Sequence, residues 1–103
     1  MSYQIKDNKI CKYPSGATVG EVKNNKVCKY PSGATLGEVK NNKIHKYPSG
    51  ATLGEVKNNK IYKYPAMSTI GDLSKLKREI KDSSKINDVH FVAMYHFLIK
   101  PIF

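Results

Sequence analysis

A repeat with a period of 17 residues constrains the fold of this chain more than any other feature. Residues 27–43 read VCKYPSGATLGEVKNNK and residues 44–60 read IHKYPSGATLGEVKNNK, so only two positions differ. Further copies occupy residues 10–26 and, with more divergence, 61–77, and IKDNK at 5–9 matches the end of a unit. Such a repeat predicts one supersecondary unit per copy, with neighbouring units sharing a core.

Each unit contains two turn signals separated by short strand-like segments. An Asn-Asn pair, as at 41–42, suits the positive φ angles of a two-residue type I′ hairpin turn. Tyr-Pro-Ser-Gly, as at 47–50, places proline where a type I turn favours it and glycine where a left-handed bulge residue follows. The segments between, such as TLGEVK and KIHKY, are too short for helices. We therefore expect two antiparallel strands per unit.

Four such units predict about eight short strands. An open meander leaves two exposed edges, and identical units favour identical neighbours. We therefore expect a mainly β fold, a pseudo-fourfold, shallow, closed antiparallel barrel, with Val39 opposite Ile44 on its core face. A glycine in mid-strand indicates a bulge or the close approach of another element. Such a glycine recurs in every unit, at Gly20, Gly37, Gly54 and Gly71.

The C-terminal residues predict one apolar helix. Residues 1–103 suit a single domain, with hairpin repeats at 5–77, a polar linker at 78–87 and a helix at 88–100 that Asn87 or Asp88 caps. The helix is apolar on almost every side, and it is shorter than the roughly 20 residues that cross a bilayer. We expect it to pack on or in the barrel, facing the glycines. A contact between copies and a shallow membrane anchor are the alternatives.

These repeats resemble a known family. The stretch IHKYPSGATLGEVKNNKIYKYP (44–65) resembles the repeats of the bacterial 4-fold β-flower family, and VAMYHFLIKPIF (92–103) resembles the hydrophobic tail of such proteins. The resemblance implies a shallow barrel of hairpins around an apolar C-terminal helix. It implies no activity, because the family is functionally uncharacterised. A looser likeness to Tubby-type barrels, which bind phosphoinositides, is an analogy of fold.

The charge favours anionic partners. The formal net charge is +10, and Arg78 is the one arginine among 18 basic residues. A basic chain of this kind suits an acidic membrane surface, an acidic protein or nucleic acid. The scarcity of arginine counts against nucleic acid. Lysines flank every Asn-Asn turn, and in a ring they gather on one rim that attracts anionic lipid; they are Lys23, Lys26, Lys40, Lys43, Lys57 and Lys60. The alternative is that they prevent aggregation at the hairpin tips.

One position of the unit varies in a way that raises the question of a metal site. Cys11, Cys28, His45 and Tyr62 occupy the same place in successive units. Thiolates and imidazole are zinc ligands, which makes Cys11, Cys28 and His45 candidates. Tyrosine is a poor zinc ligand and the spacing matches no zinc motif, so we predict a position that tolerates varied side chains, and no metal.

Catalytic motifs are missing from the sequence. It has no paired carboxylates, no nucleophile elbow and no phosphate-binding glycine loop. We expect no enzyme activity and no cofactor. With no apolar run at its start and no C-x-x-C, we expect a cytoplasmic chain with free thiols, associated with membrane through the lysine rim. The expected function is a non-enzymatic binding or scaffold module; the alternative is a structural, self-assembling or protein-interaction repeat.

Overall fold

The repeats form neighbouring strands of a single ten-stranded sheet in the computed structural model of the protein, which describes residues 2–103. Neighbouring strands are antiparallel except β1 and β10, which are parallel. The strands are β1 (Tyr3–Lys6), β2 (Lys9–Lys12), β3 (Thr18–Lys23), β4 (Lys26–Lys29), β5 (Thr35–Lys40), β6 (Lys43–Lys46), β7 (Thr52–Lys57), β8 (Lys60–Lys63), β9 (Ser68–Asp72) and β10 (Ile80–Lys81). The prediction of a mainly β structure built from repeated hairpins is confirmed, with two strands more than expected.

The Asn-Asn turns have the predicted positive φ angles, with one variation. Both central residues have positive φ at 24–25 and at 58–59, as a type I′ turn requires. At Asn41, as at Asp7, only the first central residue does, which is the φ pattern of a type II′ turn. The second turn residue also accepts a backbone hydrogen bond from the following unit, for example Val39 N to Asn25 O at 2.7 Å. Each turn thereby holds the next hairpin in place.

The Tyr-Pro-Ser-Gly turns differ from the simple type I turns expected. All four Tyr-Pro peptide bonds are cis. The amide of Gly50 donates to the carbonyl of Lys46, four residues earlier, at 2.7 Å. Gly50 has a φ of 79°, so its predicted left-handed conformation is confirmed. In the fourth unit Met67 occupies this place with a φ of 60°, a conformation that costs a residue with a Cβ about 1–2 kcal/mol.

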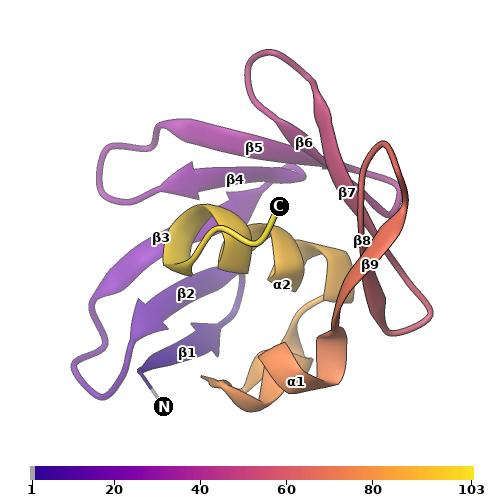
Figure 1. The fold of residues 1–103 in the computed structure, drawn as a ribbon. Helices are drawn as coiled ribbons and strands as arrows, with labels where there is room; N and C mark the ends of the chain where they lie inside the picture. The colour runs from indigo at the N-terminus through magenta and orange to yellow at the C-terminus, as the bar shows by residue number, and fades with distance from the viewer. Residues whose placement is uncertain (1) are drawn as a thin grey trace.

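The sheet curls without closing, so within residues 2–103 the expected closed barrel is not found. β9 and β10 are its edge strands, and helix α1 (Leu73–Arg78) lies between them (Figure 1). The cause is local. Asp72 accepts a hydrogen bond from Ser74 N at 3.0 Å and caps a helix where the earlier units make an Asn-Asn turn. The expected linker at 78–87 contains β10 and a short 3₁₀ helix, η1 (Ser83–Lys85).

The C-terminal segment packs in the hollow of the curled sheet (Figure 1). Helix α2 (Asp88–Met94) continues as a π-helical turn, η2 (Tyr95–Ile99). The side chain of Asn87 caps α2 by accepting from Val89 N at 2.9 Å. The apolar residues of α2 are buried together with inward-facing strand residues, which are Ile5, Ile10, Val22, Val27, Val39, Ile44, Val56 and Ile61. Among the described residues, no helix has both the length and the apolar character that crossing a membrane requires.

The mid-strand glycines are where the C-terminal segment comes closest to the sheet. A Cβ atom added to Gly20 would lie within 3.0 Å of Leu98, and one added to Gly37 within 3.0 Å of the Phe97 ring. A Cβ atom added to Gly54 would likewise lie within 3.0 Å of the Phe103 ring. We call the space beside each of these glycines a glycine notch. The predicted close approach is confirmed at these three notches, and the predicted bulge is present beside each, where the register of the ladder shifts.

His96 holds the end of the chain that carries Phe103. Its Nδ1 accepts hydrogen bonds from the backbone amides of Ile102 at 2.9 Å and of Phe103 at 3.3 Å. Both bonds require that Nδ1 carries no proton. Burial lowers the pKa of His96 from its ordinary value of 6.5, which favours the neutral ring. The docking of the chain end therefore depends on a neutral imidazole.

The glycine notches predict that a glycine-to-alanine substitution destabilises the protein at Gly37 but has little effect at the equivalent Gly71. Gly37→Ala forces its methyl group into the Phe97 ring, so we expect a loss of about 1–3 kcal/mol in the free energy of unfolding, as for other overpacked cores. Gly71→Ala has open space around the added atom and should change the free energy by less than about 0.5 kcal/mol. Urea denaturation of both variants measures the difference. Equal losses would contradict the notch description.

The His96 contacts predict that acid loosens the protein. Because the folded-state pKa lies below the unfolded value of 6.5, the unfolded chain binds more protons below that pH. The stability that His96 contributes is fully present above pH 6.5 and is lost as the pH falls through 6.5 toward the folded-state pKa. Urea denaturation at about pH 7.5 and about pH 5 checks this.

The matched variant for this prediction is His96→Asn, which keeps an acceptor oxygen and does not titrate. Its free energy of unfolding should depend less on pH between the same two values. His90 supplies a remaining dependence of the same sign, because burial lowers its pKa too. An unchanged pH dependence in His96→Asn would show that this ring does not control the docking of the chain end.

Candidate anionic-surface rim

The hairpin tips place lysines directly opposite one another. The cross-strand partner of Lys23 is Lys26, that of Lys40 is Lys43, and Lys57 stands opposite Lys60. Like charges in this position destabilise a strand pair. The six lysines predicted from the sequence thus form three like-charged pairs, and we call them the lysine rim.

A fourth pair of the same kind extends the lysine rim at one end. Lys6 stands opposite Lys9 across the turn at Asp7. Lys77 is neutralised by Asp88, whose Oδ1 lies 2.5 Å from its Nζ. Lys75 lies on α1 and lines a different pocket, which contains none of the six lysines of the rim.

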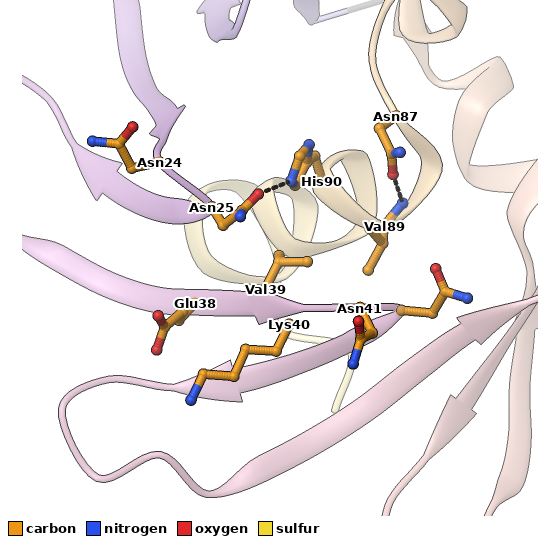
Figure 2. A pocket seen from close by; sticks show the side chains of 10 residues that line it. Asn24, Asn25, Glu38, Val39, Lys40, Asn41, Asn87, Val89 and His90 are labelled. Atoms are coloured by element: carbon orange, nitrogen blue, oxygen red, sulfur yellow. Dashed lines mark hydrogen bonds between the residues drawn. The ribbon is translucent and has the colours of Figure 1, made fainter.

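Three polar grooves separate the four hairpin tips and bring them around the start of α2. The largest, of about 610 Å³, lies between the turns at 24–25 and 41–42, and Asn87, Val89 and His90 of the α2 region also line it (Figure 2). A second groove of about 480 Å³ separates the turns at 41–42 and 58–59. The third, of about 450 Å³, lies between the turns at 7–8 and 24–25. The tips therefore form one continuous polar mouth.

A hydrogen bond joins this mouth to the helix. His90 Nε2 lies 3.0 Å from Asn25 Oδ1, so in this orientation the ring nitrogen donates to the amide oxygen (Figure 2). The bond lies at a surface that solvent reaches, and it connects a turn of the second unit with the first turn of α2. It fixes the depth at which the helix sits relative to the tips.

Lysines of the rim lie at the edges of this mouth: Lys40 lines the largest groove, Lys57 the second and Lys23 the third. In β5, Val39 points toward α2, whereas Glu38 and Lys40 point away from it (Figure 2). Lys23, Lys40, Lys57 and Lys60 are exposed, while Lys26 and Lys43 are half-buried. The positive charge thus surrounds a ring of asparagine amides, an arrangement suited to a broad anionic surface more than to one enclosed anion.

Carboxylates do not neutralise the lysine rim through close ion pairs. The register sets Lys26 opposite Glu38 and Lys43 opposite Glu55 on the outer face. In the part of the chain that the structure describes, however, the ion pairs are those of Lys77 with Asp88 and of Lys85 with Asp82. The rim therefore keeps its positive potential toward solvent.

Exposed tyrosines form a feature that the sequence interpretation missed. Tyr13, Tyr30 and Tyr47 are 41%, 51% and 40% exposed. The amine of Lys26 lies 5.7 Å from the centre of the Tyr47 ring, and Lys81 lies 5.5 Å from that of Tyr13. These distances are typical of cation–π contacts. The recurrence of Tyr-Pro every 17 residues could have indicated these exposed tyrosines, but we interpreted it only as a sign of turns.

The occupied ring faces bear on nucleic-acid binding. Single-stranded nucleic acids stack their bases on open aromatic faces. Lysine amines already cover faces of Tyr13, Tyr47 and Tyr64. The tyrosines therefore offer less stacking surface than their exposure indicates, which weakens the nucleic-acid hypothesis relative to the membrane hypothesis.

The four variable positions lie on the outer face and do not come together. Cys28 and His45 stand on β4 and β6, with β5 between them, so about 9–10 Å of sheet separates their backbones. Zinc ligands must all lie about 2.0–2.3 Å from one ion. Within residues 2–103 no group of three or more His, Cys, Asp or Glu side chains is arranged to hold a metal. The geometry gives Cys11, Cys28 and His45 no shared metal.

Three of the four variable side chains, those of Cys11, Cys28 and His45, instead contact a threonine of the next strand. Cys11 Sγ and Cys28 Sγ each lie 3.8 Å from a threonine hydroxyl, those of Thr18 and Thr35. His45 Nδ1 lies 3.1 Å from Thr52 Oγ1. One hydroxyl can serve thiol or imidazole, because it both donates and accepts. This contact explains why the position accepts both residue types.

The placement of the thiols predicts unequal reactivity. Cys11 is buried and Cys28 is half-buried, so a thiol reagent should modify Cys28 at least about tenfold faster in the folded protein. Zinc should leave the rate at Cys28 unchanged, because Glu21 is its one cross-strand partner of a ligand type and, within residues 2–103, no group of three or more ligands is arranged to hold the ion. Spectrophotometric thiol titration, with a Cys28→Ser control to assign the fast phase, measures both. Protection of Cys28 by zinc would contradict this description.

Comparison with known proteins gives no relative. No family model, no curated protein and no solved structure matches this chain.

Proposed function

We propose that this protein is a non-enzymatic binding module that attaches to an anionic membrane surface through its lysine rim. The observation that carries the proposal is the cross-strand pairing of lysine with lysine at three consecutive hairpin tips. This pairing works against the stability of the hairpins. Its recurrence at one end of the molecule favours a use for the charge outside folding.

The shape of the rim favours a surface over a small ligand. The grooves between the tips are wide and polar, and lysines such as Lys40 and Lys57 stand at their edges. Each lysine near an anionic leaflet contributes about 1 kcal/mol. Lys26 and Lys43 are half-buried over the rings of Tyr47 and Tyr64. The four exposed lysines of the rim thus supply about 4 kcal/mol for attachment without an inserted apolar segment, in keeping with the burial of α2 in the sheet.

We also propose that the protein belongs to the 4-fold β-flower family. Its repeated hairpins and the apolar helix in the hollow of the sheet support this assignment. In this proposal α1 takes the place of the strand pairing that would close the ring. A crystal structure tests it: the assignment fails if the hairpins do not surround the C-terminal helix.

Membrane attachment predicts a loss that depends on where lysines are removed. The variant Lys23→Gln/Lys40→Gln/Lys57→Gln should bind acidic vesicles about 100-fold more weakly than the natural protein, because three contributions of about 1 kcal/mol each disappear. Cosedimentation with vesicles of neutral phosphatidylcholine, with and without phosphatidylserine, measures the binding. The natural protein should bind only the acidic vesicles.

The matched control removes the same charge from the opposite end of the strands. Lys12→Gln/Lys29→Gln/Lys46→Gln alters exposed lysines beside the Tyr-Pro turns, and it should reduce binding less than about tenfold, because these charges lie farther from the membrane. Equal loss in the two triple variants would mean that net charge and not the lysine rim binds lipid. Binding to neutral and acidic vesicles alike would exclude the proposal.

A further inference from the structure

One of the four glycine notches is open. Leu98, Phe97 and Phe103 occupy the notches at Gly20, Gly37 and Gly54, whereas at Gly71 nothing lies within 4 Å of the place where a Cβ would be. A pocket of about 270 Å³ is found here, lined by β9, α1 and the C-terminal segment. Its apolar lining comes from Ile61, Ile70, Leu76, Tyr95 and Ile102. Charged residues line the pocket as well, namely Asp72, Lys75, Glu79 and Lys100, so the open notch offers apolar contacts beside charged side chains.

The strand beside this notch also lacks a neighbour that its equivalents have. The bulged residues Val19, Leu36 and Leu53 accept a backbone hydrogen bond from the tyrosine 11 residues later, at 3.0–3.3 Å. The corresponding donor for Ile70 would be residue 81, which pairs with β1 in β10 instead. β9 is therefore an edge strand, and an extended chain can add to such an edge.

Besides the tyrosines of the Tyr-Pro turns, two large apolar residues are exposed, and both lie at this edge. Ile70 is 38% exposed and Met67 is 39% exposed, and both belong to the β9 region. In the equivalent strands, Leu36 and Leu53 are half-buried. An exposed apolar edge strand that no lysine interrupts is a pairing site unless something covers it.

The charges around the notch select the partner. Lys75 and Lys100 line the pocket and are exposed. Asp72 and Glu79 line the same pocket and keep their negative charge, but hydrogen bonds hold both in place: Glu79 Oε1 accepts from the Tyr95 hydroxyl at 2.8 Å, and Asp72 caps α1. With a net charge of +10, a second copy of this chain is repelled. An acidic segment is attracted.

We propose that the β9 edge and the open notch at Gly71 bind an extended, acidic segment of a partner protein, which adds a strand to β9 and inserts one phenylalanine or leucine side chain into the notch. Main-chain hydrogen bonds along Ser68–Ile70 provide affinity, and the notch provides selection of the side chain. Lys60 of the lysine rim stands opposite Asp72 at the end of β9, but Lys23, Lys40 and Lys57 do not line this pocket, and the inference does not depend on lipid binding.

Fluorescence anisotropy with a labelled model peptide tests the proposal. The probe has a central phenylalanine between alternating valine and threonine residues, with two acidic residues at each end. We expect saturable binding to the natural protein, at least tenfold weaker binding when the phenylalanine becomes alanine, and at least tenfold weaker binding when the acidic residues become lysine. No binding up to about 1 mM probe overturns the proposal.

Variants at the notch localise the binding. Gly71→Phe fills the notch from within and should weaken binding of the probe at least tenfold, whereas Gly71→Ala leaves room and should stay within about threefold of the natural protein. If Gly71→Phe fails to fold in a thermal melt, Ile70→Ser, an exposed change on the same strand, replaces it with the same expectation. Equal binding by Gly71→Phe and Gly71→Ala overturns the proposal.

Two further controls separate this site from others. The triple variant Lys23→Gln/Lys40→Gln/Lys57→Gln should bind the probe within about twofold of the natural protein, even if it no longer binds vesicles. A concentration-dependent dimer in sedimentation that Ile70→Ser abolishes would show that a second copy occupies the β9 edge, and it would overturn the proposal of an acidic partner.

Discussion

The insertion of C-terminal side chains beside mid-strand glycines is the contact on which the rest of this structure depends. A sheet made of nearly identical hairpins has no residue large enough to fill its own hollow, because the inward positions are Val, Ile and Gly. The C-terminal segment supplies that volume: Phe91 and Met94 of α2 are fully buried, and Phe97, Leu98 and Phe103 pack against this core at the notches. The glycines are therefore as necessary as the aromatic rings, since a Cβ at any of three positions would push the segment outward.

The packing of the C-terminal segment on one side explains why the inner face of the sheet is uniform and the outer face varies. The inward-facing positions are apolar in every unit, because every unit packs against the same apolar segment. The outer face varies at Cys11, Cys28, His45 and Tyr62, where the main polar contact is with a neighbouring threonine, as Thr52 shows for His45. Charge gathers on the outer face because the inner one cannot accept it. A lysine surface is thus what this fold permits, and the arrangement of lysines in opposed pairs is what distinguishes the rim.

Much of the fold was predictable because each prediction rested on a local signal. The Asn-Asn pairs specify hairpin turns, and the mid-strand glycines indicate close approach, at Gly37 for example. Closure was predicted wrongly because the fourth unit looks like a repeat in its conserved positions while Asp72 and the leucines at 73 and 76 already encode a helix. The lysine–tyrosine contacts depend on the twist between strands, so no spacing in the sequence reveals them. The notch at Gly71 is open because the tail has three side chains that fill notches and the sheet has four mid-strand glycines. Which notch stays open can be seen only in the structure.

The match between tail and glycines has a consequence for how this gene can change. Nearly identical tandem copies are easily gained or lost by recombination, and each added copy would bring a further glycine notch. The tail has one large side chain for each of three notches, and the divergent fourth unit with its helix cap ends the sheet. Residues outside the repeat therefore limit the number of units. A duplication adds a notch for which the existing tail has no side chain.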